Sequence, residues 1–398
     1  MTKYLALILI LVACNPGTKK EESYHASNDS INKQHTDSIT TQKLEHKKLA
    51  LVNDTLNDMA AIMAGMCDSS KVFPAITANL NYKDFAAGFS KRWNDFDSNR
   101  VTRLLDFRNT ELQKAIKTEP TLFYPFSGPD ILYPVLFFPD ATKYILVGLE
   151  PVGSLPEFKD IQNDTLKRYF NKLNTSLNAI LKFSFFRTES MSKDLKNTEI
   201  NGTLHLLFLF LNRSGNTVVS AKAFTLDSLG NKVYLSGFNK LAQAKEASKG
   251  IEIMFNTANS ELKELSYFSL NMADYALKGN KGFKHYLAGM QHFNTYLKGA
   301  SYLLHKEHFS VVRNTILNGS TSIVQDDSGI AFSYFEKDGV MRNYKLFGTY
   351  SKPIAMFSNR YQKDLDSLYK KQGSTPLGFG IGYNFKDKNS NLMIITKN

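Results

Sequence analysis

Two apolar stretches of the chain each end in small or acidic residues, the first at residues 127–130 and the second at residue 150. Ser127, Gly128 and Asp130 close the segment that begins at Leu122, and Glu150 follows the β-rich run 143–149. In nucleotide-binding proteins a glycine turn lets the ligand approach the backbone, and a carboxylate about 20 residues later accepts hydrogen bonds from ribose hydroxyls. Because Gly128 and Glu150 fit this spacing, these four residues are a candidate ligand-binding site.

The unit from Phe123 to Glu150 resembles the cofactor end of a class I methyltransferase. This resemblance implies that Glu150 would hold the ribose of adenosylmethionine. The chain departs from the family in having one glycine where several are expected, and Pro129 removes a backbone donor. In the alternative interpretation the unit is only structural, with Asp130 capping a short helix and Glu150 ending a strand. The cofactor therefore stays open.

Two adjacent carboxylates, Asp326 and Asp327, follow an expected strand at residues 321–324. Adjacent carboxylates can hold a divalent cation, or serve as acid and base with separated pKa values. However, neighbours on a strand point to opposite faces, so a turn opened by an aspartate is the alternative. His305 and His308 lack a His-Glu-x-x-His arrangement, and we expect no metal there.

The elements that must position these residues alternate between strands and helices. Apolar periodicity predicts helices at 52–66 and 164–181, and a hairpin around 227–231 joins strands at 217–226 and 232–235. Further expected elements are a buried run of uncertain type at 204–211, strands at 251–255 and 265–272, helices broken near Gly299 and His308 within 283–318, and an edge strand or tight loop at 378–382. We therefore expect a single α/β body over residues 44–398, with a mixed sheet covered by helices, Rossmann-like in part.

The first 43 residues predict where the protein acts. Residues 4–12 form an apolar run, and the segment 11–14 at its end resembles a bacterial lipobox. This resemblance implies cleavage after residue 13 and lipidation of Cys14. Residues 14–43 are polar and predict a flexible tether. Within the tether, residues 20–22 resemble the export signal of Bacteroidota surface lipoproteins. These resemblances imply an outer-membrane lipoprotein, exposed at the cell surface and anchored by palmitate-type chains.

The function suggested by the whole chain is that of a lipid-anchored envelope protein binding an extracellular ligand or an envelope partner. The body resembles only lipoproteins of unknown activity, so this resemblance assigns no catalytic residue. An enzyme with a nucleotide-like or metal-assisted site is the alternative, although export removes it from cytosolic nucleotides. A net charge of +12 is spread diffusely, and the expected secretion argues against nucleic acid as a partner. Gly-x-Ser-x-Gly and P-loop motifs are absent from the sequence.

Overall fold

The computed structural model describes residues 53–183, 200–350, 352–385 and 390–397, without the side chains of residues 176–183. The described residues belong to one compact unit, Ala50–Asn398. The expected signal peptide, the lipidated Cys14 and the tether lie outside them.

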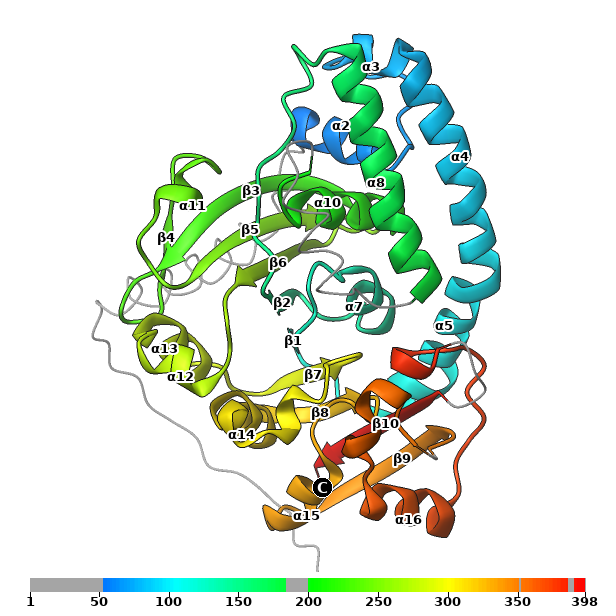
Figure 1. The fold of residues 1–398 in the computed structure, drawn as a ribbon, viewed down its shortest axis with the longest axis vertical. Helices are drawn as coiled ribbons and strands as arrows, with labels where there is room; N and C mark the ends of the chain where they lie inside the picture. Colours follow the sequence, from blue (N-terminus) through cyan, green and yellow to red (C-terminus); the bar gives the residue numbers. More distant parts are fainter. Residues whose placement is uncertain (1–52, 184–199, 351, 386–389, 398) are drawn as a thin grey trace, which may run out of the picture. The chain divides into compact units, whose positions relative to one another are not determined.

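A mixed sheet of ten strands runs through this unit in the order β4-β3-β5-β6-β2-β1-β7-β8-β10-β9 (Figure 1). The five middle strands, β6, β2, β1, β7 and β8, are parallel to one another, whereas the strands on both sides pair in antiparallel fashion. The strands are β1 (Thr121–Pro125), β2 (Lys143–Gly148), β3 (Thr217–Leu226), β4 (Lys232–Tyr234), β5 (Lys249–Asn256), β6 (Leu262–Ser269), β7 (Phe293–Leu297), β8 (Ser320–Gln325), β9 (Arg342–Gly348) and β10 (Asn391–Lys397). The expected α/β class with a mixed sheet is confirmed.

The order of the parallel strands creates a reversal in the middle of the sheet. Following the chain from β1, the next parallel strands β2 and β6 lie on one side of it, whereas β7 and β8 lie on the other. This is the third-second-first-fourth-fifth order of a doubly wound sheet, in which ligands bind where the order reverses. The reversal lies between β1 and β7.

The parallel strands are buried on both faces because their alternate side chains enter two separate cores. Leu122 and Tyr124 of β1 belong to one core, while Phe123 belongs to the other. In β2, Leu146 and Val147 divide in the same way. A strand covered on both faces carries an apolar residue at nearly every position, so it loses the alternation that marks a half-buried strand.

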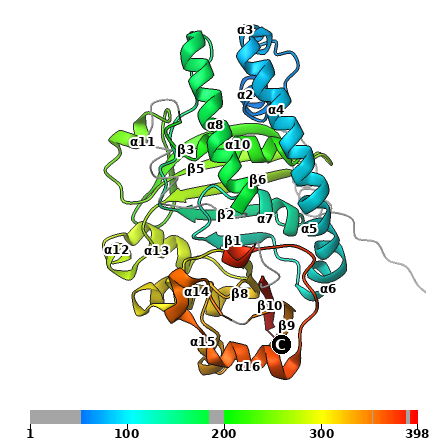
Figure 2. The same ribbon diagram turned by 45° about the vertical axis from the view of Figure 1, so that its right-hand side comes forward.

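Helices from the first half of the chain cover one face of the sheet, and helices from the second half cover the other. The first core contains residues of α2 (Asp54–Met63), α4 (Leu80–Phe96), α5 (Thr102–Phe107), α7 (Leu132–Phe137), α8 (Asn163–Phe183) and α10 (Leu204–Arg213). The second contains residues of α12 (Asp274–Lys278), α13 (Lys281–Ala288), α14 (Ser310–Gly319), α15 (Phe332–Lys337) and α16 (Lys363–Gln372). Short helices α3 (Pro74–Ala78), α6 (Gln113–Ala115) and α11 (Lys240–Gln243) complete the α-helices of the described residues. Figure 2 shows the long helices α4 and α8 running next to each other.

Most locally specified elements form as expected. The helix expected from residue 52 is α2, whose start is capped by the Asn53 side chain accepting a hydrogen bond from the backbone N–H of Leu56. The expected hairpin is the antiparallel pair β3–β4, and the Asp227 carboxylate accepts backbone hydrogen bonds within its turn. The run Leu204–Leu211, of uncertain type in the sequence, lies within helix α10 and is buried throughout.

Two expectations need correction. The stretch 283–318, expected to be helical with breaks, contains a central strand, β7. The sequence pattern did not reveal this strand, because Phe293–Leu297 is buried on both faces and shows no strand alternation. The strand expected to continue to Met272 ends at Ser269. Of the two alternatives for 378–382, an edge strand or a tight loop, the structure has a loop, which leads into the 3-10 helix η6 (Gly382–Asn384).

Candidate functional site

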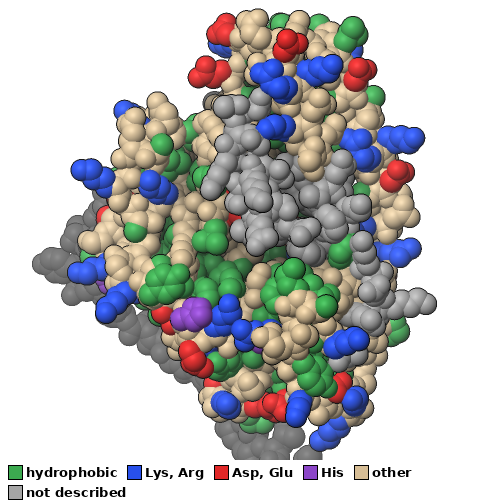
Figure 3. All heavy atoms as spheres, viewed as in Figure 1, with side chains coloured by type: hydrophobic (Ala, Val, Ile, Leu, Met, Phe, Trp, Pro, Cys, Tyr) green, Lys and Arg blue, Asp and Glu red, His purple; other side chains and the backbone are tan. Residues whose placement is uncertain are grey.

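A cavity of about 650 Å³ opens at the carboxyl ends of the parallel strands. Its wall is made by the segments that follow β1, β2, β6 and β7, together with the 3-10 helix η5 (Ala355–Arg360) and Tyr383. Figure 3 shows apolar side chains gathered in the middle of the face seen in Figure 1, with lysine and arginine side chains next to them. The cavity therefore lies where a doubly wound sheet binds its ligands.

All four residues of the first candidate site line this cavity: Ser127, Gly128, Asp130 and Glu150. The loops that carry them touch because Gly148 has no side chain. A Cβ atom at Gly148 would lie 2.9 Å from the Cα of Gly128 and 2.6 Å from Oε2 of Glu150. Gly128 itself has a φ of +54°, which glycine adopts without strain.

Asp130 forms a buried ion pair with Lys298, which follows β7. Their Oδ2 and Nζ atoms are 2.6 Å apart, and the two side chains are 3% and 1% exposed. The hydroxyl of Tyr124 also donates to this carboxylate, and the ammonium lies 3.3 Å from the ring centroid of Tyr133. Burial lowers the pKa of Lys298 to about 8, although the nearby Asp130 opposes this shift.

Asp130 also has the role of the structural alternative. Its Oδ1 atom accepts a hydrogen bond of 3.4 Å from the backbone N–H of Tyr133, in the first turn of α7. One carboxylate thus ties the start of α7 to the end of β7. The same aspartate holds the helix start and presents a charged wall to the cavity.

Glu150 lies two residues after the end of β2 and is 3% exposed. The hydroxyl of Tyr267 on β6 donates to the Glu150 backbone carbonyl at 2.9 Å. Burial, followed by the charge of Glu150, holds the pKa of Tyr267 well above its usual value. A neutral tyrosine therefore fixes the loop that carries this carboxylate.

Asp326 and Asp327 follow β8 but are not among the residues that line the cavity. Asp326 accepts hydrogen bonds from the backbone N–H groups of Gly299 and Ser328, at 2.9 and 3.0 Å. Asp327 accepts from the Tyr302 hydroxyl at 2.5 Å and from the Asn391 side chain at 2.9 Å. The two carboxylates therefore serve separate hydrogen-bond sets.

These hydrogen bonds hold loops in place. Burial raises the pKa of Asp326 to about 7, and burial also raises the pKa of Asp327. Within the described part of the chain, no group of three or more His, Cys, Asp or Glu side chains is arranged to hold a metal ion.

Backbone strain occurs in two of the loops around the cavity. Phe126, Ser301 and Tyr302 are non-glycine residues with left-handed φ values of 61°, 54° and 53°. Such conformations are unfavourable by about 1–3 kcal/mol each and are common where a loop is shaped for a ligand. Phe126 and Ser301 both line the cavity.

The sequence interpretation missed Lys298 and the strained loop that follows it. Its only signal was a lysine and a glycine at the end of an apolar segment, which we expected to be helical.

Cys67, the free cysteine of the described residues, is buried, and burial raises its thiol pKa to about 11.

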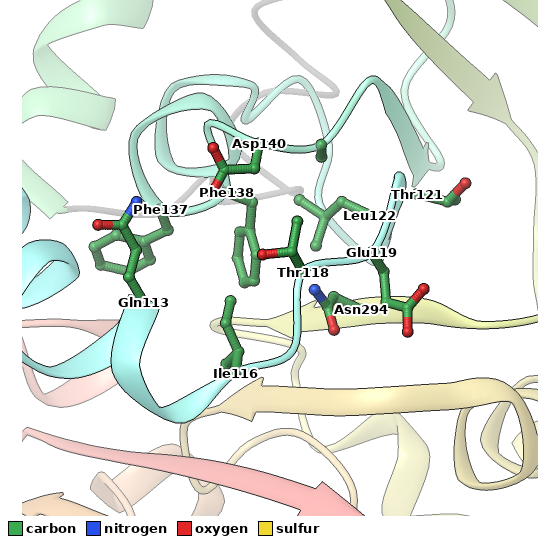
Figure 4. Close-up of a pocket in the computed structure, with 11 residues that line it drawn as sticks. Gln113, Ile116, Thr118, Glu119, Thr121, Leu122, Phe137, Phe138, Asp140 and Asn294 are labelled. Atoms are coloured by element: carbon green, nitrogen blue, oxygen red, sulfur yellow. The ribbon is translucent and has the colours of Figure 1, made fainter. Parts of the chain in front are cut away.

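A second cavity, of about 70 Å³, lies at the amino ends of the central strands, where β1 and β7 begin (Figure 4). Thr121, Leu122 and Asn294 line it, and the Asn294 side chain donates to the backbone carbonyl of Lys117 at 3.0 Å. This volume is enough for a few water molecules and too small for a typical organic ligand. The large cavity is therefore the candidate functional site.

Comparison with known proteins adds no relative to this picture. The chain matches no protein-family model, no curated protein and no solved structure. Over the described residues, no helix combines the length and the apolar character needed to span a membrane. Function must therefore be argued from the residues of the cavity itself.

Proposed function

We propose that this protein is a lipid-anchored envelope protein that binds a small hydroxyl-bearing ligand, a sugar or a nucleoside, in the large cavity. One observation carries the proposal: four residues singled out by type and spacing line one cavity where the strand order reverses. Its volume of about 650 Å³ lies in the range of small-molecule sites, roughly 300–1,000 Å³. The resemblance of residues 11–14 to a bacterial lipobox supports the anchored location.

The charged residues of the cavity limit the chemical class of ligand that it can bind. The charged residues that line it are Asp130, Glu150 and Lys298, and Lys298 is already paired with Asp130. Glu150 brings a second carboxyl group, so the polar end offers more carboxyl oxygens than cationic side chains. Such a site favours hydroxyl donors and neutral or cationic groups over anions.

A methyltransferase-like enzyme is the second candidate, and the sheet favours it. The parallel strands follow the order of a dinucleotide-binding sheet, and Glu150 follows the second strand, where ribose is bound in that fold. The Phe123–Glu150 unit, which resembles the cofactor end of a class I methyltransferase, supports the same candidate. In this version adenosylmethionine would be the ligand.

Thermal denaturation with added ligands tests the proposal. A ligand at about a hundredfold excess over its dissociation constant stabilises the folded state by about 2.7 kcal/mol. We expect one group of hydroxyl-bearing ligands to raise the melting temperature of the wild type, and Glu150→Gln to abolish that increase. Glu119→Gln is the control, because Glu119 lines the small cavity at the amino ends of β1 and β7.

The panel separates the candidates. A shift produced by sugars or free nucleosides supports the extracellular-ligand version, and a shift confined to adenosylmethionine and adenosylhomocysteine supports the enzyme. A flat panel, or equal shifts in wild type and Glu150→Gln, would contradict both.

A further inference from the structure

The mouth of the large cavity is apolar and exposed. Leu149, Tyr275 and Met356 line the cavity and are 61%, 71% and 75% exposed. They come from three separate segments: the loop after β2, helix α12 and the 3-10 helix η5. Large apolar side chains gathered around an opening mark a surface that binds apolar groups.

The apolar wall continues from this mouth towards the interior. The rings of Phe126 and Phe309 pack against each other with centroids 5.7 Å apart, and Phe357 lies 5.0 Å from Tyr383. The other apolar lining residues are Leu270, Met272, Leu303 and Ile354. An apolar group that enters between the exposed side chains would therefore remain in contact with apolar surface.

The charged residues occupy the buried part of the wall. Asp130, Glu150 and Lys298 are almost completely buried, whereas all three mouth residues are more than half exposed. The cavity is therefore polar at its buried end and apolar at its opening. A ligand that matches it must have the same two-part character.

We infer that the ligand is an amphiphile: its polar end lies near Glu150 and its acyl or aromatic part lies between Leu149, Tyr275 and Met356. This inference rests on the proposed function and names the substrate class. The polar end is neutral or cationic, because two carboxylates and one ammonium face it. An anionic fatty acid would bring a third carboxyl group next to Glu150 and Asp130, so we expect it to bind more weakly than a neutral amphiphile.

The apolar half of the inference is tested with N-phenyl-1-naphthylamine, a neutral fluorophore that brightens in apolar surroundings. We expect saturable binding to the wild type, weakened about tenfold or more in the double variant Leu149→Ser/Met356→Ser. The control is Leu229→Ser/Met341→Ser, because these side chains are 71% and 75% exposed but do not line the cavity. Unchanged binding in the first variant, or equal loss in both, would overturn the inference.

Competition tests the polar half. Octyl glucoside, below its micelle concentration, should displace the fluorophore at lower concentration than glucose, and decanoate should not displace it. Displacement by decanoate at least as strong as by octyl glucoside would contradict the inference.

The two proposals fail in different ways. Glu150→Gln should keep fluorophore binding while losing the response to hydroxyl-bearing ligands. Fluorophore binding without any response to hydroxyl-bearing ligands contradicts the proposed function, whereas that response without fluorophore binding contradicts the amphiphile.

Discussion

Lys298 and Asp130 form an ion pair that has almost no contact with water. Removing two charges from water is unfavourable, and a buried pair offsets this only when its geometry and hydrogen bonds are good. Here the Tyr124 hydroxyl and the Tyr133 backbone N–H add hydrogen bonds to the carboxylate. Breaking the pair should therefore be more costly than replacing both partners.

We predict that Lys298→Met lowers the free energy of unfolding by roughly 3–5 kcal/mol, because it leaves the Asp130 carboxylate buried without its cation. The double variant Lys298→Met/Asp130→Asn should be less destabilised than the sum of the single variants. Urea denaturation of all four proteins measures this coupling. Lys345→Met is the control, since its exposed pair with Glu111 should contribute less than about 1 kcal/mol. Additive losses would show that the two charges are not coupled.

The loops after β7 and β8 are joined by Asp326. This carboxylate accepts the Gly299 backbone N–H from one loop and the Ser328 backbone N–H from the other. Because its pKa is raised, the folded state holds a proton that the unfolded chain releases near pH 4. The associated stability is present at low pH and is lost as the pH rises towards 7.

We predict that Asp326→Asn destabilises the protein more at pH 5 than at pH 8. The difference in unfolding free energy between wild type and variant should shrink by about 2 kcal/mol over this range. Asp338→Asn provides the control, since the pKa of Asp338 is lowered and its effect should be constant above pH 5. Denaturation at several pH values measures both variants. A constant difference for Asp326→Asn would contradict a raised pKa.

At the scale of the whole molecule, a sheet with two covered faces presents its strand ends as one site. The proposed export would add a separate constraint, because a protein anchored outside the cytosol would meet only the ligands available there. An amphiphile with a neutral polar end satisfies both conditions better than a cytosolic nucleotide cofactor does. The anchoring proposal depends entirely on residues outside the described part of the chain.

We predict that the wild type incorporates labelled palmitate and partitions into detergent, whereas Cys14→Ala remains an unlipidated precursor. Cys67→Ala is the matched control, because Cys67 is a buried cysteine of the folded unit and should not affect labelling. Equal labelling of the Cys14→Ala and wild-type proteins would refute the anchor. Protease treatment of intact cells then reports whether the body is exposed at the surface.

Structure that depends on neighbours along the chain could be predicted from the sequence. The Asn53 side chain caps a helix start three residues away, and Asp227 organises a turn within four residues. The order of strand, glycine turn, short helix, strand and acid from Leu122 to Glu150 is local in the same sense, and that unit forms as predicted. Apolar periodicity likewise predicted the long helix α8.

Which segments meet at the cavity depends on the tertiary fold and could not be predicted from local patterns. Lys298 pairs with a carboxylate 168 residues earlier in the chain, and no local pattern encodes such a contact. Burial on both faces removed the alternation of β7, so its apolar residues could equally belong to a helix. The apolar mouth also depends on the tertiary fold. Leu149, Tyr275 and Met356 come from three distant segments, which the fold brings to one cavity at the carboxyl ends of the parallel strands. The chemistry of each side chain can be read from the sequence position by position. A site also depends on strand pairing between distant segments, and the packing of the whole core determines that pairing.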